Sequence, residues 1–316
     1  MEIPQILQQL ERATGWFPRS AVEAAIAQRE EITPALLGIL EHTVAHAEEV
    51  AGGEVYADYL AHLYAMLLLA QFREVRACPL VLQIAALPED VLEDLCGDFV
   101  GEDLGRVIAS VCGGEVDEIQ SLIADLDADP PGRAAALDSL LILVATGQKR
   151  RDEVAAYFSG LYQGGLEREP SFVWDALVSG SMDLSCTEQL ADIEQAYSDE
   201  LVDPEFIALR DVKEELALGP DAAQRAMAEN PYFTLVNDVV REMSGWACFR
   251  DKRSGAVDVG RNDPCPCGRA RNTRSAASSD PGCKLKSLTR VGCRCGNCLP
   301  FSCYPARSYL APRGTN

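Results

Sequence analysis

The chain has 316 residues, of which 47 % are hydrophobic, enough to form the core of one large domain or two smaller ones. No apolar run approaches the roughly 20 residues that a membrane-spanning helix needs. The first residues, Met1 to Gln5, lack the basic and apolar regions of a secretory signal peptide. We therefore expect a cytoplasmic protein with no membrane partner.

Charge is divided unevenly along the chain. Residues 1–249 carry 45 acidic and 15 basic side chains, a net of −30, whereas residues 250–316 carry 4 acidic and 13 basic, a net of +9. An acidic body repels phosphate backbones, so nucleic-acid binding by residues 1–249 is not expected. Such acidity is typical of a solubility device, and it also favours basic protein partners.

Helix signals predominate in the first part of the chain. Thr33 before Pro34 places a capping side chain ahead of a proline suited to a first helical turn, which predicts a helix start. Apolar residues at helical spacing then predict an amphipathic helix between residues 60 and 72. Pro88 is followed by two acidic residues and predicts another start, because carboxylates stabilise the positive end of the helix dipole.

The next part of the chain is predicted to be helical as well. Residues 137–144 are apolar on nearly every side, so this helix is expected to lie at the centre of the fold. Ser185 and Glu188 form a capping-box pattern, and Asp203 before a proline predicts a further helix start. Strand signals are sparse, and no Asn-Gly or Asp-Gly turn joins alternating apolar runs. The sequence therefore predicts an all-α fold.

Apolar stretches recur along this helical region at intervals of 31–40 residues, with centres near Leu37, Leu68, Ile108, Ile142 and Val178. That interval is typical of two-helix solenoid units, which stack because a single pair cannot bury its own apolar face. We expect a HEAT-like or TPR-like stack of helix pairs, an α-solenoid, with an irregular helical bundle as the alternative. This acidic helical-repeat domain is predicted to span residues 1–246, and the polar residues 247–259 to form a linker.

A cysteine motif follows the predicted linker. Residues 260–268, Gly-Arg-Asn-Asp-Pro-Cys-Pro-Cys-Gly, resemble the opening of the SEC-C motif, the zinc-binding tail of the bacterial secretion motor. The resemblance implies Cys265 and Cys267 as two of four ligands of a tetrahedral zinc site. By its spacing the other two ligands belong at positions 276 and 277, which are Ala276 and Ala277. We expect zinc in the intact motif and none bound by this chain, because two cysteines are too few ligands.

The genetic code offers an explanation for the missing half of the motif. If the codons after Gly268 are read one base earlier, they can encode Ser-Gly-Lys-Lys-Tyr-Lys-Lys-Cys-Cys, which after Gly268 completes the expected motif at the right spacing. We therefore hypothesise that residues 269–316 are an out-of-frame, mostly unstructured tail; a real variant tail is the alternative. On the first hypothesis the cysteine cluster between residues 293 and 303, plausible in isolation as a zinc site, arose by chance.

The body also resembles an uncharacterised bacterial family of helical proteins, a domain of unknown function with a SEC-C tail. The residues that carry this resemblance are 64–80, 96–110 and 196–203. The resemblance implies a helical-repeat body and a zinc tail. It supplies no catalytic residue.

The three histidines of the chain form the main candidate for other chemistry. His42 and His46 are four residues apart and share one helix face, while His62 lies on the next predicted helix. With Glu41 or Glu49 they could form a His/carboxylate metal site. The alternative is three ordinary polar or half-buried histidines on a repeat surface.

The remaining residues give little support for catalysis. The five cysteines of the body are solitary and widely spaced, so they are predicted to be free buried thiols. No Gly-x-Ser-x-Gly elbow is present, and Phe172 and Trp174 are predicted to belong to the core. We therefore expect a non-enzymatic interaction or scaffold protein that binds basic segments of protein partners, with no catalytic residue. The alternative is a metal-dependent enzyme that uses His42, His46 and His62.

Overall fold

A computed structural model describes residues 1–56 and 58–249 of the chain. Within these ranges the chain forms helices and no strand; a single isolated β-bridge joins Arg12 to Tyr59. The all-α prediction is therefore confirmed. The α-helices are α1 (Ile3–Leu10), α2 (Arg19–Ala27), α3 (Arg29–Ala45), α4 (Ala47–Gly52), α5 (Ala61–Phe72), α6 (Cys78–Ala85), α7 (Glu89–Cys96), α8 (Gly105–Val111), α9 (Asp117–Ala124), α10 (Pro130–Ala145), α11 (Arg151–Gly160), α12 (Phe172–Asp183), α13 (Leu190–Ser198), α14 (Leu209–Leu216), α15 (Pro220–Glu229) and α16 (Val239–Met243).

Short 3₁₀ and π segments join several of these helices. They are η1 (Glu54–Tyr56), η2 (Val75–Ala77), η3 (Val100–Leu104), η4 (Leu161–Gly165), η5 (Thr187–Gln189) and η6 (Ala247–Phe249). Among the described residues, no helix is both long and apolar enough to cross a bilayer. Most of the predicted linker, the half motif at 260–268 and the tail 269–316 lie outside the described residues.

The described residues fall into two compact units. The first comprises Met1–Arg12 and Pro18–Arg241, and the second contains Ala13–Phe17 together with described residues 242–249. In the second unit the Phe17 and Phe249 rings pack edge to face with centroids 5.5 Å apart, and Trp246 stacks on Phe249 at 6.4 Å. The first unit contains all of α1 to α15 and is the helical body.

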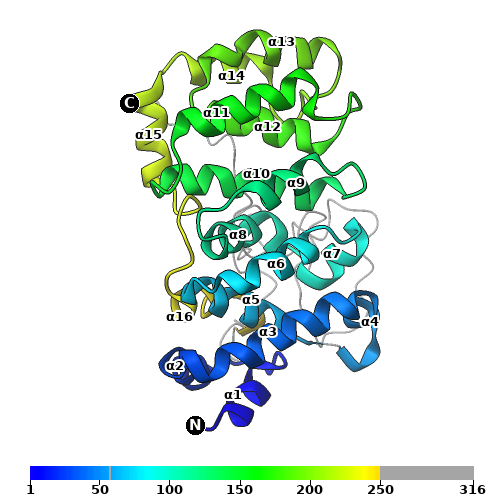
Figure 1. Cartoon of the computed structure of the whole chain (residues 1–316), viewed down its shortest axis with the longest axis vertical. Coiled ribbons are helices and arrows are strands. Elements are labelled where there is room, and N and C mark those ends of the chain that lie inside the picture. Colours follow the sequence, from blue (N-terminus) through cyan, green and yellow to red (C-terminus); the bar gives the residue numbers. More distant parts are fainter. Residues whose placement is uncertain (57, 250–316) are drawn as a thin grey trace, which may run out of the picture. The chain divides into compact units, whose positions relative to one another are not determined.

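The five predicted apolar centres lie on five helices that pack in chain order. Leu37 lies on α3, Leu68 on α5, Ile108 on α8, Ile142 on α10 and Val178 on α12, and none is more than 9 % exposed. Helix α3 packs against α5, α5 against α8, α8 against α10, and α10 against α12 (Figure 1). Helices α4, α6, α7, α9 and α11 flank this row. The interval of apolar stretches thus predicted the order of the stack.

Two helices of the row are buried on every side. Residues 61–70 of α5 are all buried, which differs from the amphipathic helix predicted there, because α1, α3 and α8 all pack against α5. Helix α10 was predicted to be central and is, since α8, α9 and α12 cover it. Its first turn also lies against the end of α6: a Cβ added to Gly132 would sit 1.7 Å from the carbonyl oxygen of Ala85. Only glycine allows this approach of the two backbones.

Helix starts were predicted with mixed success. The start at Pro88 is confirmed, because Pro88 is the N-cap residue of α7. The start at Thr33 and Pro34 is wrong: α3 begins at Arg29 and contains the proline. The Thr33 hydroxyl donates to the carbonyl of Arg29 at 2.7 Å, so it bonds within the helix instead of capping it.

At two further predicted helix starts, the residues expected to cap a helix form other contacts. Asp203 accepts from the amide of Glu205 at 2.8 Å and closes one turn that does not continue; the next helix, α14, begins later. Ser185 has a left-handed backbone, with φ of 52°, whereas a serine that caps the start of a helix has an extended one. Glu188 lies 3.0 Å from the guanidinium of Arg151 instead of completing a capping box. At Glu188 a side chain from α11 therefore overrides the local signal, and at Asp203 a local turn does.

Candidate functional site

The three predicted site histidines lie in two different environments. His42 and His46 are exposed at the end of α3, with ring centroids 4.4 Å apart. His62 lies on α5, is 2 % exposed, and its Nε2 lies 2.7 Å from the carbonyl oxygen of Leu95 on α7. Within residues 1–56 and 58–249 no three His, Cys, Asp or Glu side chains are grouped as a metal ion would require.

Two tyrosines connect these histidines into one row of rings. The His42 Nε2 and the Tyr56 hydroxyl are 2.9 Å apart, and the Tyr56 and Tyr59 rings pack edge to face at 5.2 Å. Tyr59 stacks on His62 with centroids 5.6 Å apart and planes within 14°. The tyrosines come from η1 and the turn before α5, and sequence reasoning overlooked them, although aromatic residues at 56, 59 and 62 recur every third position.

The hydrogen bond to Leu95 determines the state of His62. A carbonyl oxygen only accepts, so Nε2 carries the proton and Nδ1 is the acceptor nitrogen. The buried Nδ1 has no hydrogen-bond partner. Burial lowers the pKa of His62 to about 4, while the bond to Leu95 opposes that shift. The imidazole is therefore neutral near pH 7, with an unused acceptor.

A polar cavity of about 360 Å³ opens beside this row of rings. We call it the tyrosine pocket and define it by Glu54, Tyr56, Asp58, Tyr59, His62 and Asp94. Its three carboxylates are exposed, and none forms an ion pair with another described residue. The nearby Arg12 donates to the carbonyl of Val55 at 2.6 Å and faces Glu11 at 3.4 Å. The pocket thus combines aromatic rings, a buried histidine with an unpartnered acceptor, and three exposed carboxylates.

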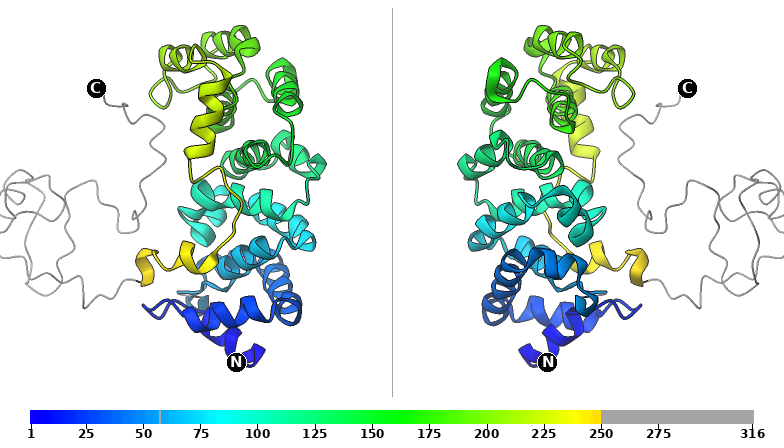
Figure 2. Two further views of the ribbon diagram at one scale, coloured as in Figure 1. Left: turned by 90° about the vertical axis from the view of Figure 1, so that its left-hand side faces the viewer. Right: turned by 90° about the vertical axis from the view of Figure 1, so that its right-hand side faces the viewer.

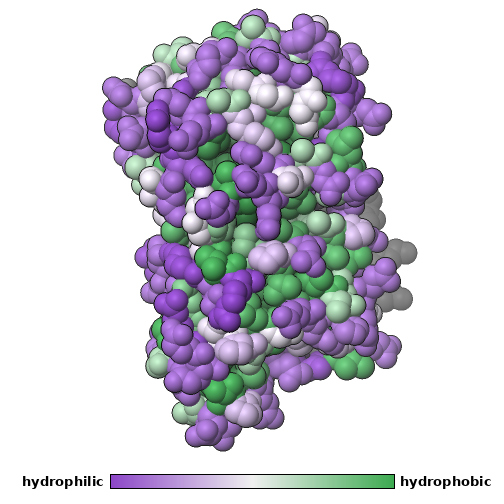
Figure 3. Space-filling model, in the orientation of Figure 1, coloured by the Kyte–Doolittle hydropathy of each residue, from purple (hydrophilic) through white to green (hydrophobic). Residues whose placement is uncertain are grey.

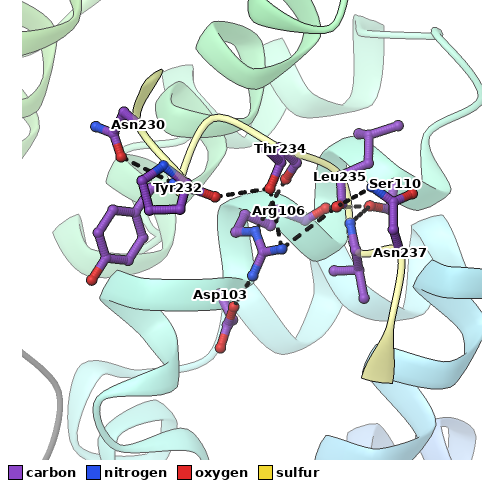
Figure 4. A network of polar contacts seen from close by, with 10 residues as sticks. Asp103, Arg106, Ser110, Asn230, Tyr232, Thr234, Leu235 and Asn237 are labelled. Atoms are coloured by element: carbon purple, nitrogen blue, oxygen red, sulfur yellow. Dashed lines mark hydrogen bonds and ion pairs between the residues drawn. The ribbon is translucent and has the colours of Figure 1, made fainter. Parts of the chain in front are cut away.

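An extended segment forms the second notable feature of the body. Residues 231–238, which we call the strap, run from α15 back past α8 toward α5 (Figure 2). Arg106 on α8 donates from Nε to the carbonyl of Thr234 at 3.1 Å and from Nη1 to Asp103 at 2.6 Å (Figure 4). The Ser110 hydroxyl accepts from the amide of Val236 at 3.0 Å.

Helix α5 holds the far end of the strap. Arg73 donates to the carbonyl of Val236 at 2.7 Å and to the side chain of Asn237 at 2.6 Å. Phe233 and Val236 are buried, at 5 % and 0 % exposure. Side chains of two stacked helices thus hold an extended backbone through its own carbonyl and amide groups. No local sequence pattern predicts these contacts, because their partners are 126 to 164 residues apart in the chain.

The cysteines of the body are poor nucleophiles. All five are free; Cys96, Cys112 and Cys186 are buried, Cys78 is half-buried, and Cys248 is exposed, against the prediction that all would be buried. Burial raises the pKa of the Cys96 and Cys186 thiols to about 12, so both are protonated near neutral pH. The half-site residues Cys265 and Cys267 lie outside the described residues.

The two aromatic residues predicted to belong to the core differ in their burial. Trp174 is fully buried, as predicted, and its Nε1 donates to the carbonyl of Glu167 at 2.9 Å. Phe172 is 44 % exposed, so its assignment to the core is wrong. Its ring instead packs edge to face against Phe206 at 5.4 Å, because it lies at the first, outward-facing position of α12.

Comparison with known proteins places the body in a family. Residues 1–250 match the family described as protein of unknown function (DUF1186). An uncharacterized protein of Chlamydia trachomatis (serovar D) is 39 % identical over 247 residues, which is 78 % of this chain and 96 % of the relative. One of Chlamydia muridarum is also 39 % identical over 247 residues, covering 78 % of this chain and 97 % of the relative.

The family match ends at residue 250, before the cysteine motif of this chain, and the matches to the two relatives take up nearly the whole of each relative. No solved structure matches the chain. The family match therefore covers the helical body, and the chain belongs to the DUF1186 family of proteins of unknown function.

Proposed function

We propose that this chain is a non-enzymatic protein-interaction protein whose acidic helical body binds basic segments of a partner. The carrying observation is the surplus of carboxylates on the body. Residues 1–249 hold 45 acidic and 15 basic side chains, so one-to-one pairing would leave 30 carboxylates without an internal cation. Hydrophilic side chains cover much of the face drawn in Figure 3. Such a surface attracts basic chains and speeds their association.

The strap supports the same proposal from inside the chain. It is an extended segment held on the helix stack by Arg73, Arg106 and Ser110 through backbone groups, with apolar side chains buried beneath it. Stacked helices commonly bind partners along an extended face. The strap thus supports binding of an extended partner, and the negative charge of the body favours a basic one.

The proposal is tested by fluorescence anisotropy on the full chain. The probe is a labelled, arginine-rich peptide, and the control is the same peptide with every arginine replaced by citrulline, which has nearly the same shape and no charge. We expect saturable binding of the arginine peptide at one per chain, weakening steeply between about 50 and about 300 mM salt. Equal binding of the two peptides, or salt-independent binding, would contradict the proposal.

The cysteine motif is a separate proposal. In the intact motif Cys265 and Cys267 would share zinc with two further cysteines, and zinc would fix the fold of the tail. Ala276 and Ala277 cannot supply those ligands, so the residues of this chain do not fit the metal. Restoring the reading frame after Gly268 is expected to give a chain that binds one zinc, while the present chain binds none. A shifted frame that does not encode the two cysteines contradicts the hypothesis.

A metal-dependent activity is the competing function. Its support is the pair His42 and His46, whose rings lie 4.4 Å apart. Purified protein and a variant with alanine at His42, His46 and His62 separate the two ideas by metal analysis. Bound transition metal that is lost in the variant would favour the enzyme, and equal metal content would favour the interaction protein.

A further inference from the structure

We infer that the tyrosine pocket binds one arginine side chain of the basic partner segment. This inference rests on the proposed function and names the group that is recognised. The pocket is formed by α4, η1, α5 and α7 of the body. Its cavity of about 360 Å³ is of the size that small-ligand sites have, so it can hold a guanidinium group.

The first support is the acceptor at the base of the pocket. His62 is 2 % exposed and neutral, its Nε2 hydrogen is used by Leu95, and its Nδ1 has no partner. A buried acceptor without a donor is costly, and a group that donates to it would remove that cost. Nδ1 accepts in the plane of the imidazole, so a donor approaches it along the ring edge and not through the face on which Tyr59 stacks. The missing partner is therefore a hydrogen-bond donor that arrives from the pocket.

The second support is the arrangement of the rings. Tyr59 lies nearly parallel to His62, and Tyr56 meets Tyr59 at an interplanar angle of 86°. Tyr56, Tyr59 and His62 all line the cavity, so a ligand in it meets aromatic surface. Cations bind the faces of aromatic rings, and a planar guanidinium can also stack on them. The rings therefore favour arginine over the compact ammonium of lysine.

The third support is charge. Glu54, Asp58 and Asp94 are exposed at the pocket and form no ion pair with another described residue. The cation nearby, Arg12, already faces Glu11. A guanidinium carries five N–H donors in a fixed plane, so it can reach Nδ1 of His62 and still bond a carboxylate. A neutral or anionic ligand would leave these carboxylates uncompensated.

The test uses the full chain and Nα-acetyl-arginine amide, with Nα-acetyl-citrulline amide and Nα-acetyl-lysine amide as comparisons. Affinity is measured by calorimetry, and the nitrogen NMR signal of His62 Nδ1 reports whether that atom accepts a hydrogen bond. We expect the arginine compound to bind at least about tenfold more tightly than citrulline, and to shift the Nδ1 signal at saturation. Equal binding of arginine and citrulline, tighter binding of lysine, or an unmoved Nδ1 signal would overturn the inference.

Two variants of α7 provide the matched control. Asp94→Asn removes a pocket carboxylate, and Glu93→Gln removes the neighbouring exposed carboxylate that does not line the pocket. We expect Asp94→Asn to weaken the arginine compound at least about tenfold and Glu93→Gln to weaken it less than about twofold. Equal effects would mean general acidity and would refute the pocket.

The two proposals fail separately. If the arginine-rich peptide binds wild type and Asp94→Asn equally well, the pocket is wrong while the interaction function stands. If the arginine compound binds in the pocket and the peptide does not bind, the pocket stands and the protein partner is wrong.

Discussion

Lowering the pH should decrease the free energy of unfolding of this protein, because the buried His62 does not accept a proton in the folded state. The pKa of this imidazole is lowered by burial from 6.5 to about 4 in the folded state. Between these two pKa values His62 binds a proton in the unfolded chain but not in the folded chain. The contribution of neutral His62 to the free energy of unfolding is therefore complete above pH 6.5 and is lost as the pH falls toward 4. At about 1.36 kcal/mol per pKa unit the loss is roughly 2 kcal/mol at about pH 5 and roughly 3 kcal/mol at about pH 4.

The assay is urea unfolding of wild type and His62→Gln between about pH 7 and about pH 5, which stays above the isoelectric point near 4.5. Glutamine keeps an N–H that can donate to Leu95 and does not titrate. The difference between the free energies of unfolding of the two proteins should shrink by roughly 2 kcal/mol over this range. His46→Gln, at an exposed histidine, should leave the wild-type pH dependence in place. A constant difference between wild type and His62→Gln would refute the buried neutral state of His62.

Two further predictions concern the packing of α10. Gly132→Ala should lower the free energy of unfolding in urea by at least about 3 kcal/mol, because the added Cβ would overlap the carbonyl of Ala85. The control Gly38→Ala, on an open face of α3, should raise it by up to about 1 kcal/mol. Equal effects of the two substitutions would contradict the close approach of the backbones at Gly132. Glu167→Ala should cost about 3 kcal/mol, because it leaves the guanidinium of Arg133, at 2 % exposure, without the carboxylate that it bonds through two contacts of 2.8 Å. A neutral result for Glu167→Ala would show that Arg133 finds other partners.

The order of the helix stack could be predicted because it depends on a property repeated along the chain. Each apolar centre, from Leu37 to Val178, is flanked by polar turns, and burial of its helix requires the next one. Local signals were less reliable. Thr33 and Ser185 both resemble caps, yet Thr33 bonds within α3 and Ser185 lies in a left-handed turn. A cap is worth about 1 kcal/mol, which tertiary contacts readily exceed.

The candidate site could be predicted only in part. Its histidines stand out in a sequence that has three of them. Their separation was not visible, because His62 is fixed by a carbonyl on α7, 33 residues away, and by a tyrosine in a short turn. The strap contacts were beyond sequence reasoning for the same reason. Arg106 and Arg73 are ordinary surface arginines by pattern, and only the return of the chain along the stack gives them carbonyl partners.

The most direct measurement of the central claim is the binding of the arginine-rich peptide and its citrulline counterpart to the full chain and to Asp94→Asn. Tight, saturable binding of the arginine peptide to wild type is predicted, with at least about tenfold weaker binding to Asp94→Asn and to wild type when arginine is replaced by citrulline. If both peptides bind wild type equally, or neither binds, the carboxylates of the body do not recognise basic partners and the account is wrong.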